Sequence, residues 1–338
     1  MRIGTRGSRL ALTQARLVAK LIADAHPDAG EPEIVVVRTS GDTQSERARA
    51  GSTNGGVNAG AGATKPLAGD KSRWVAELEQ ALLAGNIDLA VHSAKDLPGE
   101  TVEGLELLGA TARAGAEDAL IGVHSLQELP EGARVGTSSV RRAAQLRAAR
   151  ADLQIVSLRG NVDTRLRKLA EEVRETGESS SEDSSSLHAI VLASAGLQRL
   201  GRESDIGCTL DVARFVPAPG QGLLALQTRT GDERVGTAVE PILDQDASAC
   251  LRAERAVAQA LGAGCNTPLG AYAVPAGCGC LHLHAWVGLP DGSAWLLDEL
   301  LGGFYDPAEL GGRMAERLHA AGARELLKRA EEMALEHR

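Results

Sequence analysis

Five arginines stand at or just after the ends of predicted strands, and their type and spacing suit anion binding. They are Arg141, Arg142, Arg159, Arg165 and Arg199. Segment 136–142, GTSSVRR, also holds a predicted helix start near Ser138 or Ser139, where free backbone N–H groups favour anions. Guanidinium forks match carboxylate and phosphate groups. Because strand ends of an open α/β sheet converge on one crevice, the recurrence favours a shared polyanion cleft over solvated surface charge.

A second polar constellation follows an apolar strand within segment 91–98. It contains His92, Ser93, Lys95 and Asp96. A Ser–His nucleophile is disfavoured, because the two residues are sequence neighbours and no elbow-type glycines flank the serine. Lys95 and Asp96 either form a structural ion pair or serve chemistry, in which case Asp96 would act as an acid, a base or an anionic stabiliser of a cation.

A glycine-rich loop at 262–268 carries Cys265 just past a predicted helix. A cytosolic cysteine is usually a small buried apolar residue. The flanking glycines instead indicate that a bulky group approaches the backbone here, which makes covalent use of the thiol an alternative.

Four further residues alternate along segment 278–284, and they are of the types that zinc prefers. They are Cys278, Cys280, His282 and His284. An extended segment would present all four on one face, as a zinc site or a zinc-dependent enzyme requires. Glycine on both sides of Cys278 favours a hairpin tip, so we predict no metal site.

The composition requires any anionic ligand to meet a local basic cluster. The 338 residues carry 36 basic and 45 acidic side chains, a net charge of -9, which in bulk repels nucleic acid and anionic lipid. With three Trp, two Tyr and two Phe, base stacking has little support. Five irregularly spaced cysteines, no signal-peptide pattern and no membrane-length apolar run predict a cytoplasmic protein with free thiols.

Alternating strands and helices must position these side chains. Apolar runs predict strands, and amphipathic stretches predict helices between them, which indicates two α/β units with mainly parallel sheets. The predicted strands are 2–6, 34–37, 87–91, 155–158, 190–192 and 223–227. The last hundred residues change to a helix at about 248–261, a hairpin around 290–292 and further helices, which predicts a smaller α+β domain.

Three segments interrupt this alternation. Residues 47–64 and 178–186 are rich in small and polar residues with almost nothing to bury, so they are predicted to be mobile loops. Segment 216–222 combines two prolines with two glycines, which is typical of a hinge.

Seven motifs in this order resemble those of the porphobilinogen deaminase family, also called hydroxymethylbilane synthases. The motif segments are 2–11, 92–98, 136–142, 157–161, 195–201, 219–222 and 264–270. The resemblance covers nearly the whole chain. It implies two α/β domains like those of type II periplasmic binding proteins and a smaller C-terminal α+β domain. The implied boundaries are 1–111 with 223–240 for a discontinuous domain 1, 112–222 for domain 2 with the arginine-rich cleft, and 241–338 for domain 3 with the cofactor cysteine.

The same resemblance implies a transferase that joins four porphobilinogen molecules head to tail with loss of ammonia and then releases hydroxymethylbilane by hydrolysis. Cys265 would hold a covalent dipyrromethane cofactor, and Asp96 would be the catalytic residue. The implied cofactor-binding residues are Ser93, Lys95, Thr137, Ser139, Arg141, Arg142, Arg159 and Arg165. The implied substrate-binding residues are Arg6, Ser8, Lys71, Arg159, Arg165, Arg199 and Gln221.

One segment departs from the family pattern, and one other class of protein shares the implied fold. The family has two lysines in a glycine-rich segment before the first-domain helix, and only Lys71 has a counterpart within 66–74. A non-catalytic, two-lobed module that binds a small anion would need no reactive cysteine. The enzyme is expected to act as a cytoplasmic monomer on porphobilinogen, without nucleic acid or membrane partners.

Overall fold

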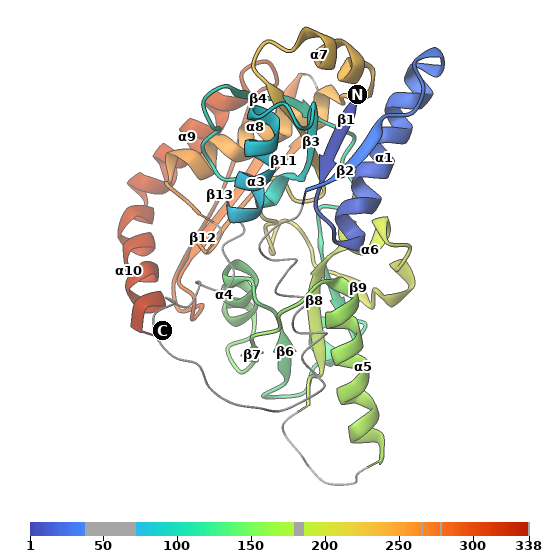
Figure 1. Ribbon diagram of the computed structural model, residues 1–338. Coiled ribbons are helices and arrows are strands. Elements are labelled where there is room, and N and C mark those ends of the chain that lie inside the picture. The colour runs from blue at the N-terminus through green and yellow to red at the C-terminus, as the bar shows by residue number, and fades with distance from the viewer. Residues whose placement is uncertain (38–71, 179–185, 265, 278, 337–338) are drawn as a thin grey trace, which may run out of the picture. The chain divides into compact units, whose positions relative to one another are not determined.

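The computed structural model describes residues 1–37, 72–178, 186–264, 266–277 and 279–336 (Figure 1). The chain divides into two compact units, each built from separate stretches of sequence. The first unit comprises 1–92, 96–108 and 226–242, and the second comprises 93–95, 109–225 and 243–338. The second unit includes most of the segments assigned above to domains 2 and 3, so the three-domain boundaries stay a prediction.

The first unit is built around a five-stranded sheet in the order β2-β1-β3-β10-β4. Strand β1 pairs in parallel with both β2 and β3, as a βαβ pattern requires. The strands are β1 Arg2–Thr5, β2 Glu33–Val36, β3 Leu89–Ser93, β4 Leu105–Ala110 and β10 Leu224–Arg229. The helices and short 3-10 turns are α1 Arg9–Ala25, η1 Pro27–Ala29, α3 Ser72–Leu83, α7 Glu233–Val239 and η5 Glu240–Ile242. The turn η2 Ala94–Asp96 spans the boundary, with 94–95 in the second unit and 96 in the first.

Helix α1 shows how local sequence sets these elements. The Ser8 side chain accepts the N–H of Ala11 and caps the first turn. Ala15, Val18 and Ile22 recur at helical spacing and are buried, so one face of the helix packs toward the sheet.

The second unit contains another five-stranded sheet, in the order β7-β6-β8-β5-β9. Strand β6 is parallel to β7 and β8, but β5 is antiparallel to β8 and β9, so the expected mainly parallel sheet is mixed here. The strands are β5 Asp118–Ile121, β6 Arg134–Gly136, β7 Gln154–Val156, β8 Ala189–Ala193 and β9 Cys208–Thr209. The helices and turns are η3 Leu126–Glu128, α4 Val140–Ala149, α5 Val162–Glu178, α6 Ser194–Arg199 and η4 Glu203–Asp205. A short, fully buried run such as β5 carries no sign of strand direction.

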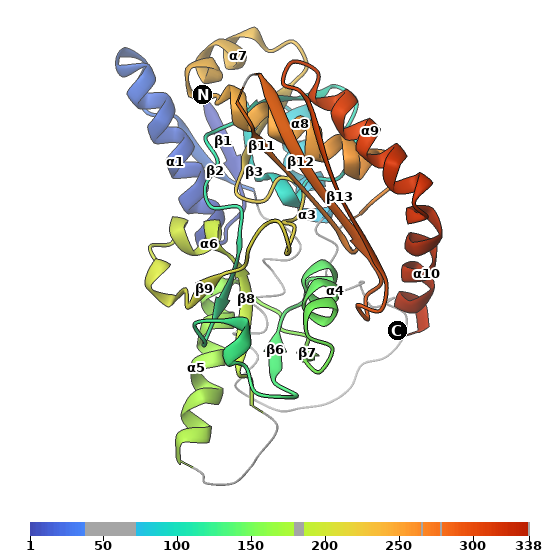
Figure 2. The same ribbon diagram turned by 180° about the vertical axis from the view of Figure 1, so that it is seen from behind.

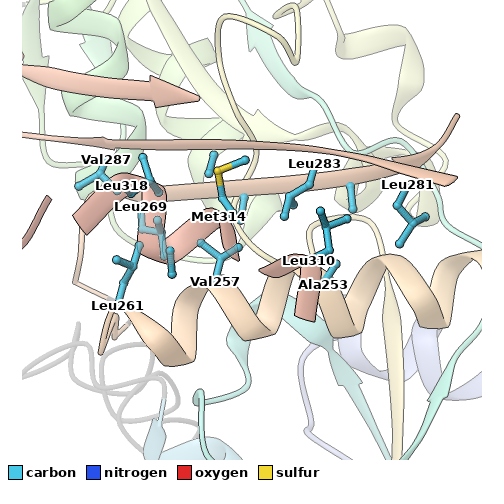
Figure 3. Packing of buried hydrophobic residues seen from close by; sticks show 14 of the residues in the cluster. Ala253, Val257, Leu261, Leu269, Leu281, Leu283, Val287, Leu310, Met314 and Leu318 are labelled. Carbon is cyan, nitrogen blue, oxygen red and sulfur yellow. The ribbon is translucent and has the colours of Figure 1, made fainter. Parts of the chain in front are cut away.

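The C-terminal part of the second unit is a three-stranded antiparallel sheet covered by helices (Figure 2). Its elements are α8 Gln245–Ala260, β11 Leu269–Pro275, β12 Cys280–Gly288, β13 Trp295–Gly303, α9 Pro307–Ala320 and α10 Ala323–Glu336. Val257 of α8 and Met314 of α9 meet Leu283 of β12 in an aliphatic core (Figure 3). The expected fold class, two α/β sheets with a smaller C-terminal α+β part, is confirmed.

The glycines around the β11–β12 turn take backbone angles that suit a hairpin. Gly277 and Gly279 have φ of 75° and 69°, and the N–H of Cys280 bonds to the carbonyl of Gly277. The predicted hairpin tip is therefore confirmed, and Cys278 itself lies outside the described residues.

The two loop predictions fall largely outside the described residues. This holds for all of 47–64 and for 179–185 within 178–186. Among the helices that the structure describes, none has the length and apolar character needed to cross a membrane.

Candidate active site

The arginine motif at the start of α4 is held in place by its own hydroxyl side chains. Oγ1 of Thr137 accepts the N–H of Ser139 at 3.2 Å, and Oγ of Ser139 accepts the N–H of Arg142 at 3.4 Å. Ser139 is thus the N-cap of α4, which decides between the two positions, Ser138 and Ser139, at which the sequence predicted the helix to begin. Thr137 and Ser139, two of the residues expected at the cofactor, therefore fix the turn that presents Arg141 and Arg142.

Asp118, the first residue of β5, binds both of these arginines. Nη2 of Arg141 donates to Oδ2 at 2.8 Å, and Nε of Arg142 donates to Oδ1 at 2.9 Å. Arg141 also donates to the carbonyl of Val216 at 2.8 Å, and Arg142 to that of Val191 at 3.1 Å. Asp118, Arg141 and Arg142 are only 1%, 4% and 7% exposed, so these pairs are shielded from solvent.

Burial shifts the pKa values of the aspartate and the arginine in opposite directions. Burial alone would raise the pKa of Asp118, but the charges of Arg141 and Arg142 hold it well below its usual range. Burial lowers the pKa of Arg141, although the opposing charge of Asp118 limits the effect. The carboxylate therefore stays ionised and accounts for one of the two arginine charges.

Gln221 connects this pair of arginines to Lys95. Its Nε2 donates to Oδ1 of Asp118 at 2.8 Å and to the carbonyl of Ala116 at 2.7 Å. Its Oε1 accepts hydrogen bonds from Nζ of Lys95 at 3.3 Å and from Nη2 of Arg142 at 3.5 Å. We call Asp118, Arg141, Arg142, Gln221 and Lys95 the Asp118 cluster; it holds three cations and one carboxylate.

Two more of the predicted arginines carry charge without a carboxylate partner in the described part of the chain. Nε of Arg165 donates to the carbonyl of Gly160 at 2.9 Å, and Nη2 of Arg199 donates to that of Gly222 at 2.6 Å. Burial lowers the pKa of Arg199 to about 10, and burial and then the charge of Arg142 lower the pKa of Arg165. Both groups would gain from an added anion.

Arg159 differs from the other arginines because it is exposed. It directly follows the buried Leu158, and the structure gives its side chain no hydrogen bond or ion pair with the described residues. Its guanidinium group is therefore available to a ligand.

The segment expected to carry catalysis forms the end of β3 and the turn η2. Ser93 ends the strand, and Lys95 and Asp96 are half-buried residues of the turn. His92 is buried and donates from Nε2 to Oε1 of Gln227 at 2.9 Å, while Gln227 donates to Glu79 at 3.0 Å. This chain of polar groups gives His92 a structural partner, which agrees with the expectation that Ser93 and His92 do not form a nucleophilic pair.

The N-terminal motif lies in the first unit. The guanidinium carbon of Arg6 is 3.7 Å from the ring centroid of Trp74, which is cation–π stacking. Ser8 caps α1. Lys71, expected to bind substrate, lies outside the described residues.

Cys265 also lies outside the described residues, but its flanking loop is described. The loop follows α8, and the N–H of Gly264 donates to Oγ1 of Thr267 at 2.9 Å while the N–H of Thr267 donates back to the carbonyl of Gly264 at 3.0 Å.

Sequence reasoning missed the acidic residues that hold the basic ones. Asp118 anchors the two arginines, and Glu254 of α8 pairs with Arg113 at 2.7 Å. Both acids are buried. Their local sequence gives little sign of this role, because Asp118 stands beside Glu117 and Glu254 lies between Arg252 and Arg255. Acidic residues are rarely buried unless they are paired.

Two family models together match most of the chain. The model described as "Porphobilinogen deaminase, dipyromethane cofactor binding domain" matches residues 1–237. The model described as "Porphobilinogen deaminase, C-terminal domain" matches residues 248–320.

Curated relatives agree over nearly full length. A porphobilinogen deaminase of Syntrophus aciditrophicus is 38% identical, covering 98% of this chain and 99% of the relative. Those of Deinococcus radiodurans and Roseiflexus castenholzii are each 41% identical, with 98% and 96% of this chain and 98% and 97% of the relative covered. Among solved structures, a TRAP periplasmic solute binding protein from Ralstonia eutropha H16 aligns over 76% of this chain and 79% of its own, at 11% identity and a TM-score of 0.36.

Proposed function

This chain belongs to the porphobilinogen deaminase family, a family of transferases with a dipyrromethane cofactor, and we propose specific roles for its residues in that reaction. The single observation that carries the proposal is the Asp118 cluster. In it the buried guanidinium groups of Arg141 and Arg142 share the single carboxylate of Asp118, which leaves one arginine charge in excess. A ligand rich in carboxylates would neutralise this excess charge.

The donor set fits the cofactor. Each pyrrole of a dipyrromethane bears two carboxylates, and guanidinium and ammonium groups are their natural partners. Arg159 and Arg165 would bind these carboxylates directly, since neither is paired with an acid in the described residues. When bound, the cofactor supplies the pyrrole that is extended by successive substrate units.

The buried arginines, Arg141 and Arg142, would have a different role from the exposed Arg159. Arg141 and Arg142 already share Asp118, so they contribute positive potential and fix the start of α4, with Ser139 and Thr137 holding the turn. Gln221 uses both its oxygen and its nitrogen within the cluster and would position Lys95. Ser93 and Lys95 would complete the cofactor contacts.

Asp96 would be the catalytic residue. Loss of ammonia from porphobilinogen leaves a pyrrole-conjugated cation, and a carboxylate interacts more strongly with that charge than with the neutral ground state. The same carboxylate would assist proton transfer at the pyrrole nitrogen. Asp96 directly follows Lys95 in the turn η2, so the Lys95–Gln221 bond would help to fix its backbone.

A further set of residues would recognise the substrate by binding its carboxylate side chains. Arg199 is a half-buried cation with only a carbonyl partner, which suits it to a propionate or acetate group. Arg6 and Ser8 at the start of α1, together with Lys71, would add contacts to the incoming substrate. Products would leave as hydroxymethylbilane after four additions.

Intact mass spectrometry tests the covalent assignment. We expect the purified chain to exceed its sequence mass by one dipyrromethane and the Cys265→Ser variant to lack this adduct. Cys208→Ser is the matched control and should keep it. An unmodified wild-type chain, which a non-catalytic anion-binding module would give, would contradict the proposal.

Single-turnover kinetics test the role of Asp96. Asp96→Asn should fold and bind substrate while the chemical steps slow by orders of magnitude, and Asp96→Glu should keep part of the rate because the charge survives. A destabilised Asp96→Asn variant with a near wild-type rate per folded molecule would assign Asp96 to a structural ion pair instead.

A cytoplasmic location and a monomeric state are part of this proposal. The odd number of irregularly spaced cysteines favours a reducing compartment. Light scattering over a range of protein concentrations should give the mass of one chain.

A further inference from the structure

Two histidines and a glutamate lie together on one face of the C-terminal sheet. His282 and His284 are alternate residues of β12, and Glu299 of β13 is directly opposite His284. Alternate residues of a strand share a face, so these side chains leave the sheet on the side opposite the core residues Leu281 and Leu283. The hairpin prediction gave the histidines of segment 278–284 no function, but the fold places them beside a carboxylate.

The spacing of these groups is that of ligands around one metal ion. One ligand atom of each residue lies within 4.8 Å of the other two. Oε2 of Glu299 is 3.3 Å from Nε2 of His282 and 3.6 Å from Nδ1 of His284. Tetrahedral bonds of about 2.0–2.1 Å to zinc place neighbouring ligand atoms about 3.3–3.4 Å apart. Only small side-chain movements would close the three groups around an ion.

We propose that His282, His284 and Glu299 bind one divalent transition-metal ion of the zinc type, with water completing the coordination. Two imidazole nitrogens and one carboxylate oxygen suit zinc and its neighbours, whereas calcium and magnesium require mainly oxygen ligands. The side chains of His284, His282 and Glu299 are 13%, 31% and 68% exposed. The site is thus open on one side, where an ion enters and water binds.

The surroundings favour a bound cation. The ring of Tyr272 on β11 stacks on that of His284, with centroids 6.4 Å apart and planes 25° apart, which orients the imidazole. Asp211 acts electrostatically on His284 and adds a second negative charge. Leu297 and Leu301 stand two residues either side of Glu299 on the same strand face, and apolar side chains beside a metal site lower the local dielectric.

A bound ion would cross-link β12 and β13. Because the ion binds the folded sheet and not the unfolded chain, it would stabilise the C-terminal part of the second unit in proportion to its free concentration. None of the three ligands belongs to the set proposed for cofactor or substrate, so the metal site stands apart from the proposed function.

The experiment uses the full-length chain, freed of metal with a chelator and titrated with zinc chloride by calorimetry. We expect one zinc ion per chain and a higher melting temperature with zinc. His284→Asn and Glu299→Gln should each weaken binding roughly tenfold or more, because each removes a ligand. His124→Asn, an exposed histidine on another segment, is the matched control and should bind like wild type.

Cysteines compete for zinc, so a second arm tests the ligand set. Cys280 lies on the same strand face as His282, and Cys280→Ser should keep the zinc ion if the histidines and Glu299 hold it. The His282→Asn/His284→Asn double variant should lose both the zinc-dependent melting shift and the visible absorption of the cobalt-substituted protein, with its circular dichroism unchanged. No saturable binding by wild type, or binding that survives the double variant, would overturn the proposal and leave these residues as an ion pair only.

Discussion

The guanidinium group of Arg113 donates two hydrogen bonds to the carboxylate of Glu254, at 2.7 and 2.8 Å. The same carboxylate accepts the N–H groups of Gly220 and Ala273, and Arg113 also donates to the carbonyls of Ala273 and Gln221. Glu254 is fully buried. One ion pair therefore joins the segment after β4, the 216–222 segment, helix α8 and strand β11 within the second unit.

Arg113→Leu should strongly destabilise the second unit. The substitution leaves Glu254 buried without its cation, and breaking one side of a buried pair costs about 3–5 kcal/mol. Urea unfolding followed by circular dichroism measures this loss.

The exposed pair of Arg317 and Asp298 provides the control. It has the same two-bond geometry, at 2.7 and 2.8 Å, but its side chains are 54% and 24% exposed. Arg317→Leu should therefore cost less than about 1 kcal/mol. Equal losses for the two arginine variants would show that burial does not set the value of these pairs.

Arg141 and Arg159 should respond differently to replacement by leucine. Arg141→Leu removes one of the two arginine partners of the buried Asp118 and one of the two donors to the carbonyl of Val216, which keeps its bond from Gln145. Stability should therefore fall by about 3 kcal/mol. Arg159→Leu changes an exposed side chain, so stability should shift by less than about 0.5 kcal/mol.

The activity of each folded molecule should fall more in Arg159→Leu than in Arg141→Leu, the reverse of the order expected for stability. Per folded molecule, Arg159→Leu should reduce cofactor loading and turnover, and Arg159→Lys should restore only part of either, because lysine lacks the guanidinium fork. Intact mass and activity assays measure both. An Arg159→Leu variant with full cofactor and wild-type turnover would remove Arg159 from the binding site.

Gly220 is predicted to accept no side chain. Its φ is 75°, and a Cβ would lie 2.8 Å from Cβ of Ala94 and 3.1 Å from N of Lys95. Gly220→Ala should therefore strain the backbone and displace the turn η2. It should lower both the melting temperature and the turnover, for which we propose Asp96 of this turn as the catalytic residue.

Gly231 separates these two effects. It has nearly the same φ, 76°, but a Cβ there would meet nothing within 4 Å. Gly231→Ala should carry the conformational cost of about 1 kcal/mol and leave turnover unchanged. If both alanine variants lose equal activity, contact with the turn is not what matters at Gly220.

Sequence patterns pointed to the basic residues of the candidate site and not to the acidic residues that pair with them. Arg141 and Arg142 follow a strand and a helix cap, two patterns that local sequence displays. Asp118 and Glu254 are distant in sequence from the arginines that they bind, and long-range pairing leaves no periodic signal. Asp118 adds a carboxylate from within the chain, which the expected binding of Arg141 and Arg142 to ligand carboxylates did not include.

The same reason explains which parts of the fold were predictable. Helix α1 and the parallel strands β1 and β2 show their apolar periodicity within one βαβ unit. Strand β5 has four buried residues, and only its antiparallel partners β8 and β9 define its direction. Neither apolar periodicity nor a short buried run indicates which distant segments of the chain pair with each other.

The carboxylate of Asp88 should give the first unit a stability that depends on pH. Its Oδ2 accepts the N–H of Arg2 at 2.8 Å, its Oδ1 accepts Nη2 of Arg2 at 3.0 Å, and Arg229 and Arg234 lie within 3.5 Å. Burial alone would raise the pKa of Asp88, but these hydrogen bonds and charges lower it from 3.8 to about 2.

A lowered pKa means that folding favours the charged carboxylate, so the stabilisation is present above about pH 4 and is lost as the pH falls towards about 2. Asp88→Asn should therefore lower the free energy of unfolding by about 2 kcal/mol at pH 7, and the gap from wild type should close between about pH 4 and pH 2. Urea unfolding at a series of pH values measures the gap. The control Asp24→Asn breaks an exposed pair with Lys20 and should change stability at pH 7 by less than about 0.5 kcal/mol. A gap for Asp88→Asn that stays constant down to pH 2 would mean that shape and hydrogen bonding, rather than the charge of Asp88, hold the ends of strands β1 and β3 together.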